Sequence, residues 1–437
     1  MSRRYLIVGA GAAGVAAAEA IRAADPAAEL TILGEEKHPF YSRPGLAYYL
    51  TGELPERQLF LSQIRPFRHL RVPVTAIHPD AHRVTLSNGQ TLSYDRLLIA
   101  TGSQAIPLPL PGADLTGVVK LDTLDDARHI LKLAKRDKPA VVIGGGITAL
   151  EIVEGLLARG MQVHYLLRGD RYWRNVLDET ESRLVEERLV EEGVQLHHRT
   201  QAAEFVGKRG RVTAVRTTDG RLFECRLVAV SVGVRPRMEL AQAAGLHTER
   251  GILTNEYLQT SHPDIFAAGD VAQVFDPFSG ATVLDTLWGT AVAQGRAAGR
   301  NMAGETAPYR KEVPLNVTRL AGLTTTIIGT VGRGPDEDLL GIARGDSETW
   351  RQLPDVIAAQ SNFEVNRLRL LVGKKRLVGA LVMGDQTLSQ PLHHLIARRA
   401  DITPIRDKLL APNAPLADII AAFWISWRKR HAPSPEL

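Results

Sequence analysis

The feature that most constrains this chain is a pattern that occurs twice: a short apolar run, a glycine-rich turn and a stretch of helical composition. In the first copy, residues 5–8 are apolar, Gly9, Gly11 and Gly14 form the turn, and residues 15–24 are rich in alanine. This spacing predicts a dinucleotide fingerprint, in which Gly9 permits a tight turn, Gly11 lets the backbone approach a diphosphate, and Gly14 allows helix and strand to pack closely. The free N–H groups at the helix N-terminus would then face the phosphates.

A second apolar run at residues 30–33 follows this helix and predicts the next strand of a βαβ unit. Glu35 follows that strand, about 20 residues after the last glycine, where such folds place the acid that holds a ribose hydroxyl. Ala13, inside the turn, belongs to the same candidate site. We therefore expect the first βαβ unit to bind a dinucleotide.

The second copy begins with the apolar run 140–143 and continues through Gly144, Gly146 and Ala149, where alanine is an accepted variant of the third glycine. A helix is expected at about residues 150–159 and a strand at 162–167. Two copies of one βαβ unit predict two dinucleotide sites.

The second copy has no acid at the end of its second strand, where Leu167 is followed by Arg168. Arg168, Arg171 or Arg174 could pair with a 2′-phosphate, which favours NADPH over NADH. An alternative remains open, in which these arginines are solvated and Asp170 or a backbone group holds the ribose.

Length and composition exclude several protein classes. With 437 residues the chain is long enough for about three domains, and 23% charged with 44% hydrophobic residues is typical of a globular protein. A net charge of +5 does not indicate nucleic-acid binding. No apolar run reaches the ~18 residues needed to span a bilayer, and the N-terminus lacks the pattern of a secretory signal, so we expect a cytoplasmic enzyme.

Turn signals at Asn88-Gly89 and Asp219-Gly220 predict hairpins, and the proline-rich residues 106–112 predict a linker. From residue 313, strand-like runs come first and helical segments follow, which predicts an α+β domain. Further strands are expected at residues 83–86, 91–94, 96–100, 211–217, 221–225, 227–233, 325–329, 368–372 and 376–383.

Three further motifs occur in order with the fingerprints: Ala100-Thr101-Gly102, Gly233 with Pro236, and a segment ending in Gly269-Asp270. Together they resemble the flavoprotein superfamily of pyridine nucleotide-disulfide oxidoreductases, from residue 1 to about 310. The resemblance implies an α/β fold with two Rossmann-like domains and an α+β C-terminal domain. It also implies three parts: an FAD-binding domain at 1–115 and 250–312, an NAD(P)H-binding domain at 116–249, and an interface or acceptor domain at 313–437.

By position, the resemblance implies which residues hold each cofactor. Asp270 is similar to the acid that binds the flavin ribitol, Val74 to a backbone contact with adenine, and Trp288 to a residue at the flavin pyrimidine end, although Trp288 could equally be a core residue. The implied FAD residues are Gly9, Gly11, Ala13, Gly14, Glu35, Arg43, Val74, Ala100, Thr101, Gly102, Asp270 and Trp288. The implied NAD(P)H residues are Gly144, Gly146, Ala149, Arg168 and Gly233.

The redox cysteines of that superfamily are absent, because Cys225 is the one cysteine of the chain and follows a hairpin of the second domain. Residues 38–50 resemble the segment that carries the flavin-facing cysteine in coenzyme A disulfide reductases, but Pro44 stands there. The segment also resembles the Tyr-Asp-Arg-Pro-Pro-Leu-Ser-Lys motif of ferredoxin and rubredoxin reductases and of the flavin part of nitrite reductases, with Arg43 retained and Tyr48 at the lysine position. Cys225 is expected to be a buried structural thiol.

Hydride transfer between stacked rings needs geometry rather than a strong acid or base, so no catalytic residue is predicted. The histidine pairs at 197–198 and 393–394 lack accompanying carboxylates, and no metal site is predicted from them.

The electron acceptor stays open between several classes. A one-electron protein carrier such as a ferredoxin or rubredoxin is the leading hypothesis; a quinone, O2 and a role as flavoprotein subunit of a larger redox complex are the alternatives. Residues 415–427 predict an apolar helix with two tryptophans, followed by the cations of residues 428–430. Such a helix could lie on the inner face of a membrane, or bury itself against its own domain or a second subunit.

Overall fold

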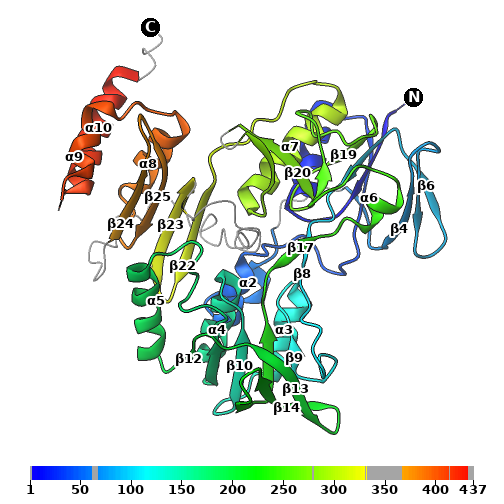
Figure 1. Ribbon diagram of the computed structural model, residues 1–437. Coiled ribbons are helices and arrows are strands. Elements are labelled where there is room, and N and C mark those ends of the chain that lie inside the picture. The colour runs from blue at the N-terminus through cyan, green and yellow to red at the C-terminus, as the bar shows by residue number, and fades with distance from the viewer. Residues whose placement is uncertain are drawn as a thin grey trace. The chain divides into compact units, whose positions relative to one another are not determined.

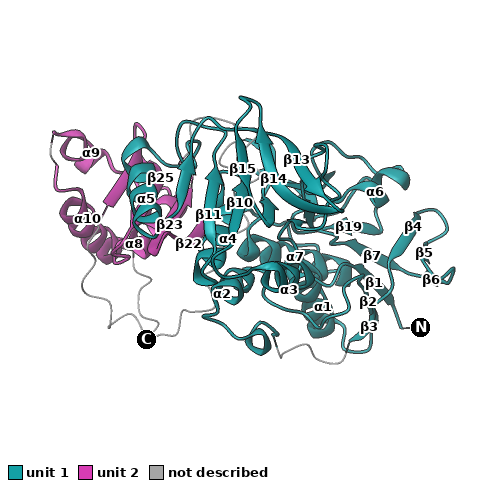
Figure 2. Cartoon of the chain, turned by 90° about the horizontal axis from the view of Figure 1, so that it is seen from below, with its two compact units in different colours: residues 1–311, 336–345 teal, residues 312–335, 346–437 magenta. Residues whose placement is uncertain are grey.

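The computed structural model describes residues 2–61, 67–277, 280–329, 331, 367–412 and 414–431 (Figure 1). The chain forms two compact units, one of residues 1–311 with 336–345 and the other of residues 312–335 with 346–437 (Figure 2).

The first sheet of the larger unit is parallel and has the strand order β19-β7-β1-β2-β3. Its strands are β1 (Arg4–Val8), β2 (Glu29–Leu33), β3 (Arg68–Leu70), β7 (Arg96–Ile99) and β19 (Ile265–Ala267). A parallel sheet covered on both faces reads as continuous apolar runs, and the runs 5–8 and 30–33 are buried throughout. Strand β19 joins this sheet although its residues follow the whole second fingerprint, so the first sheet is discontinuous in sequence.

Two helices of this part, α1 (Ala12–Ala24) and α7 (Trp288–Ala303), pack closely against each other (Figure 2). Their close approach depends on Gly295, because a Cβ there would lie 2.2 Å from the carbonyl oxygen of Ala13. The contact brings the start of α7 to the first glycine turn.

The second sheet of the larger unit is also parallel, with the order β12-β11-β10-β16-β9. Helix α4 (Ile147–Ala158) packs on it, and an antiparallel layer of three strands lies beside it. The strands of the sheet are β9 (Val118–Val119), β10 (Pro139–Ile143), β11 (Gln162–Leu166), β12 (Gln195–His197) and β16 (Leu227–Val230). Those of the layer are β13 (Ala202–Lys208), β14 (Arg211–Thr217) and β15 (Leu222–Glu224).

The helices after both fingerprints begin three residues earlier than predicted. Helix α1 begins at Ala12 and α4 at Ile147, because Gly11 and Gly146 are the N-caps and are themselves extended. The alanine-rich stretch 290–302 also predicts a helix from its composition, and α7 begins two residues before it, at Trp288. The small residues at the end of the first turn gave no sequence signal for the position at which the helix begins.

Residues 106–110 have no regular secondary structure, as the proline-rich sequence predicts. The chain on either side of it does pair: β8 (Ser103–Ala105) lies antiparallel to β17 (Val234–Pro236), which the sequence did not reveal. This short ladder brings the residues after β17 to the end of the first sheet.

The described residues of the larger unit also form five further helices and two small antiparallel or mixed sheets. The helices are α2 (Gly45–Thr51), the short 3-10 helix η1 (Glu56–Gln58), α3 (Leu124–Leu133), α5 (Glu179–Glu191) and α6 (Glu239–Ala243). One sheet consists of β4 (Val74–His78), β5 (Arg83–Leu86) and β6 (Thr91–Ser93), and the other of β18 (Ile252–Leu253), β20 (Ala272–Asp276) and β21 (Ala281–Leu284).

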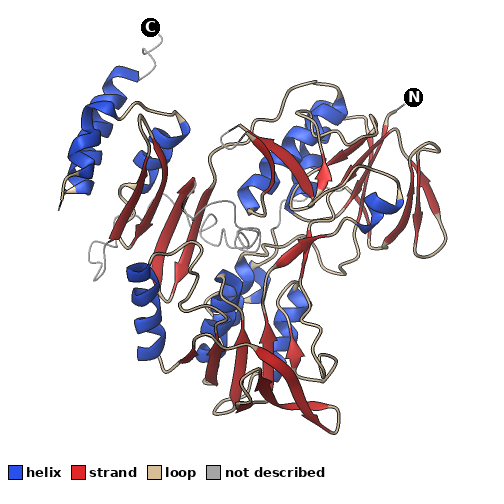
Figure 3. Ribbon diagram, in the orientation of Figure 1, coloured by secondary structure: helices blue, strands red, loops and turns tan. Residues whose placement is uncertain are grey.

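The smaller unit is an antiparallel sheet of order β22-β23-β25-β24 with helices beside it, as the predicted α+β domain requires (Figure 3). The elements are β22 (Leu315–Leu320), β23 (Leu323–Gly329), β24 (Arg367–Val372), β25 (Leu377–Met383), α8 (Ser389–Ala397), α9 (Thr403–Leu410) and α10 (Leu416–His431).

Helix α10 is the predicted C-terminal helix, and its inner face packs into the core of its own unit. Ile420 is fully buried and Phe423 is 5% exposed, in one cluster with Leu392 of α8. Among the described residues, no helix is long and apolar enough to cross a membrane. One of the open alternatives, burial against its own domain, therefore describes this face of α10.

Candidate active site

A cavity of about 330 Å³ lies around the first fingerprint, a volume within the usual range of ligand sites. Its wall includes the N-terminus of α1, the ends of β2 and β7, and the start of α7. The predicted residues that line it are Gly9, Gly11, Ala13, Glu35, Arg43, Val74, Ala100, Thr101, Gly102, Asp270 and Trp288.

The glycine turn has the shape that the fingerprint predicts. Gly9 has φ +121°, and a Cβ on it would lie 2.0 Å from the carbonyl oxygen of Ala100. A Cβ on Gly14, which packs beneath the turn instead of lining the cavity, would lie 1.9 Å from the oxygen of Gly9. Gly11 has open space around the position of its missing Cβ. The backbone at Gly11 is thus free to receive a diphosphate, and these residues fit FAD.

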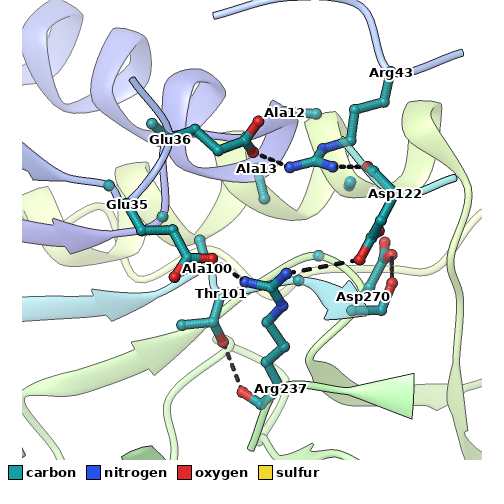
Figure 4. Close-up of a pocket in the computed structure, with 18 of the residues that line it drawn as sticks. Ala12, Ala13, Glu35, Glu36, Arg43, Ala100, Thr101, Asp122, Arg237 and Asp270 are labelled. Carbon is teal, nitrogen blue, oxygen red and sulfur yellow. Dashed lines mark hydrogen bonds and ion pairs between the residues drawn. The ribbon is translucent and has the colours of Figure 1, made fainter. Parts of the chain in front are cut away.

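The far wall of the cavity carries an ionic network around Arg43 (Figure 4). Arg43 donates to the carboxylate of Glu36 and to the backbone oxygen of Asp122. The Tyr41 hydroxyl donates to Glu36 at 2.7 Å, and burial raises the pKa of this phenol. Tyr41 therefore stays neutral and holds the carboxylate that orients Arg43.

A second arginine in the cavity, Arg237, was not among the predicted residues. Its guanidinium binds Glu35, and its Nη2 lies 3.7 Å from Oδ2 of Asp122, whose side chain is fully buried (Figure 4). The backbone of Arg237 is fixed as well, because its N–H donates to Gly102 O at 2.9 Å and its carbonyl accepts from Thr101 Oγ1 at 2.8 Å. The one sequence signal for it is that Arg237 directly follows Pro236.

Polar and aromatic groups line the remaining wall. Asp270 accepts a hydrogen bond of 2.6 Å from Ser103 Oγ. The ring of Trp288 stacks on Phe40, with centroids 5.6 Å apart and planes at 15°. The hydroxyl of Thr286, also in the wall, is buried without a hydrogen-bond partner among the described residues. A polar ligand would satisfy that hydroxyl.

The second fingerprint repeats this geometry at the end of β10. Gly144 has φ +147°, and a Cβ there would lie 2.0 Å from the oxygen of Ser231, whereas Gly146 is open and Ala149 is fully buried. These residues, Arg168 and Gly233 do not line the cavity at the first fingerprint. Thr148 and Glu151 of α4 do line it, so the helix after the second fingerprint reaches the first site. The fingerprint glycines did not point to either residue.

Strand register relates the two acid positions directly. Val8 pairs with Leu33 beside the first turn, and Glu35 follows Leu33 by two residues. Ile143 pairs with Leu166 beside the second turn, and Arg168 follows Leu166 by two residues. Arg168 therefore occupies, in the second fold, the position that Glu35 occupies in the first.

Cys225 lies apart from the cavity and is 2% exposed, within the apolar cluster beneath the antiparallel layer. Burial raises the pKa of its thiol to about 12, which agrees with the predicted structural role. His197 contacts the ring of His164 at 3.1 Å. The described part of the chain contains no group of three or more metal-ligating side chains.

Comparison with known proteins agrees with this architecture. The family model described as "Pyridine nucleotide-disulphide oxidoreductase" matches residues 3–295. The chain is 33% identical over 388 residues to the biphenyl dioxygenase system ferredoxin–NAD(+) reductase component of Paraburkholderia xenovorans, covering 86% of this chain and 93% of that protein.

Two further relatives cover nearly all of the chain. The NAD(P)H nitrite reductase of Bacillus subtilis is 29% identical over 92% of this chain, which spans about half, 48%, of that longer protein. The putidaredoxin reductase–putidaredoxin complex contains a chain that superposes with a TM-score of 0.80 at 26% identity, covering 96% of this chain and 98% of that one. Members of the matched family bind FAD and NADH or NADPH. The chain belongs to the pyridine nucleotide-disulphide oxidoreductase family and is an FAD-dependent NAD(P)H oxidoreductase.

Proposed function

We propose that this protein passes electrons from NAD(P)H through FAD to a ferredoxin- or rubredoxin-like protein, without a redox disulfide. The observation that carries the proposal is the cavity at the first fingerprint, which contains Pro44 and no cysteine. Cys225 is buried elsewhere, so no thiol can take electrons from the flavin. Electrons must leave to an external acceptor, and the ferredoxin reductase relative covers most of both chains.

Each of the two parallel sheets is assigned to one cofactor. Residues 1–115 and 250–312 form the FAD-binding domain, residues 116–249 the NAD(P)H-binding domain, and residues 313–437 the acceptor domain. Support comes from the two sheets, each with its own fingerprint, and from the compact unit that begins at residue 312.

The chain's own residues bind and orient. The N-terminus of α1 and the open backbone at Gly11 would hold the diphosphate, Asp270 would hold the ribitol, and Trp288 would border the flavin pyrimidine end. FAD held there would supply the chemistry that takes a hydride from NAD(P)H and delivers single electrons to a carrier. Hydride transfer requires no side chain that acts as a strong acid or base, and geometry provides the rate enhancement.

NADPH is the preferred nucleotide, with Arg168 pairing its 2′-phosphate. The strand register supports this role, because Arg168 stands where an acid would hold an unphosphorylated ribose. Arg168→Ala should raise KM for NADPH at least tenfold and leave KM for NADH within twofold. Arg136→Ala is the matched control, since Arg136 is exposed and precedes the opposite end of β10. Equal effects on both nucleotides would refute the preference.

The acceptor is tested by steady-state turnover with saturating NADPH. A [2Fe–2S] ferredoxin, a rubredoxin, a soluble quinone and O2 are compared under identical conditions. A ferredoxin or rubredoxin should give a kcat/KM at least tenfold above the other two. A faster rate with quinone or O2 would contradict the proposal.

A quinone at the inner membrane face is the second candidate acceptor, favoured by the end of α10. Trp424 and Trp427 are half-buried there, and the three following cations, residues 428–430, are exposed. Deleting α10 would open the core at Phe423, so the test uses Ile425→Ser and a triple serine variant of 428–430. Loss of co-sedimentation with anionic liposomes, together with loss of the quinone rate alone, would favour this candidate. Size-exclusion chromatography of the same variants shows whether this face joins two copies.

A further inference from the structure

The charges around the first fingerprint do not suit an anionic ligand unless particular cations compensate them. Among the described residues that line the cavity, six carry carboxyl groups, and only two, Arg43 and Arg237, carry guanidinium groups. The six acids are Glu35, Glu36, Asp122, Glu151, Glu239 and Asp270. The diphosphate of FAD adds two negative charges to this site. Both arginines therefore matter more here than in a neutral pocket.

The two arginines are held differently. Arg43 has both of its terminal groups engaged, one by Glu36 and one by the backbone oxygen of Asp122. Arg237 binds Glu35 through Nη1, while its Nη2 lies at the longer distance of 3.7 Å from Asp122. The Nε–H of Arg237 is buried and has no hydrogen-bond partner among the described residues. A buried N–H without a partner costs about 1–3 kcal/mol, so a ligand that accepts this hydrogen bond is favoured.

Arg237 also stands at the correct part of the cavity. Its backbone is bonded to Thr101 and Gly102. These residues directly follow Ala100, whose carbonyl oxygen faces Gly9 so closely that a side chain cannot fit there. The side chain of Arg237 is 26% exposed, and its ion-pair partner is the acid that follows β2. Arg237 thus joins Thr101, which follows β7, to Glu35, which follows β2 (Figure 4), and β1 with its glycine turn lies between these two strands in the sheet.

We propose that Arg237 is a cofactor-binding residue that compensates the charge of the FAD diphosphate and donates to it, and that Glu35 holds its guanidinium across the glycine turn. The fingerprint alone provides backbone N–H groups and a helix dipole equivalent to about half a charge. Arg237, although paired with Glu35, adds a guanidinium whose Nε–H has no partner among the described residues. This inference concerns FAD binding and does not depend on which acceptor the protein uses.

The test measures FAD binding to the apoprotein, with neither NAD(P)H nor acceptor present. Arg237→Ala should raise the Kd for FAD at least tenfold in a flavin fluorescence titration and accelerate FAD release to a similar degree. Arg237→Lys, which keeps the charge, should recover at least half of the lost log affinity. The salt dependence supplies a second readout, because log Kd should rise less steeply with log[NaCl] in Arg237→Ala than in the wild type.

Arg235→Ala is the matched control, because Arg235 is exposed, lies two residues away on β17 and does not line the cavity. It should bind FAD like the wild type. The proposal is overturned if Arg237→Ala and Arg235→Ala have the same Kd and salt dependence, or if lysine recovers no affinity. A loss confined to KM for NADPH would also overturn it. Apoprotein thermal midpoints of all variants show that each one is folded before titration.

Discussion

The clearest consequence of the first glycine turn is that two of its glycines should fail for opposite reasons when each is replaced by alanine. Gly9 is required by the fold, because a Cβ would meet the oxygen of Ala100 at 2.0 Å and the backbone has φ +121°. The fold does not require Gly11, because its φ of −84° and ψ of −168° suit alanine and no heavy atom lies within 4 Å of the position that a Cβ would take. Gly11 is required by the ligand instead. The pair therefore separates stability from cofactor binding.

The magnitudes follow from these geometries. In Gly9→Ala the new Cβ must move more than 1 Å to reach ordinary contact distance, which costs about 1–3 kcal/mol of overpacking. The positive φ adds about 1–3 kcal/mol of backbone strain. At about 1.5 °C per kcal/mol for a unit of this size, a total of about 2–6 kcal/mol should lower the apoprotein thermal midpoint by roughly 3–9 °C. In Gly11→Ala, a gain of about 0.4–1 kcal/mol from a stiffer unfolded chain offsets a weaker N-cap of similar size, so the midpoint should barely change.

The assay uses apoprotein, since bound FAD would itself raise the midpoint of any variant that retains it. Circular dichroism gives the thermal midpoint, and flavin fluorescence gives the Kd for FAD. Gly11→Ala should melt within about 1 °C of the wild type and bind FAD at least a hundredfold more weakly. The reasoning is refuted if Gly9→Ala melts like the wild type, or if Gly11→Ala binds FAD normally.

Three further predictions concern groups outside the cofactor site. Cys225, with its pKa raised to about 12 by burial, should resist iodoacetamide at pH 8 and react in urea; labelling of the folded protein would contradict its burial. Arg128 lowers the pKa of Glu56 from 4.5 to about 2, so this carboxylate stabilises the fold above pH 4.5 and loses that effect as pH falls toward 2. Glu56→Gln should flatten the fall in urea midpoint between pH 6 and 3, and an unchanged slope would argue against the pair. Phe423→Ala should destabilise the smaller unit by about 3–5 kcal/mol, followed by tryptophan fluorescence in urea, whereas Ile425→Ala, at an exposed site, should change stability by less than about 0.5 kcal/mol.

Local signals account for the parts of the fold that could be read in advance. Each fingerprint places a buried strand, a glycine turn and a helix within about 20 neighbouring residues, and the turn is fixed by sterics at Gly9 and Gly144. The boundary errors of two or three residues lie at helix starts, because the extended N-cap glycine and the first helical residues look alike in sequence. The β8–β17 ladder escaped detection because each strand has only three residues and the pairing joins segments more than 100 residues apart.

In the candidate site, too, local sequence patterns predicted some residues and missed others. The motif residues that follow β1, β2, β7 and β19 gather around one cavity, because these strands end at the same edge of one parallel sheet. Arg237, Asp122 and Glu151 belong to no such motif, and their place in the cavity depends on how strands and helices far apart in the chain meet.

The sequence by itself determined the two nucleotide folds, their order, and the absence of a redox disulfide, because these depend on residues adjacent in the chain and on a cysteine count of one. The tertiary structure alone decided that Glu35 pairs with Arg237, that Arg43 bridges Glu36 to Asp122, and that α10 turns Phe423 into its own core. Charge compensation and burial are sums over neighbours in space, and those neighbours come from parts of the chain that no local pattern connects.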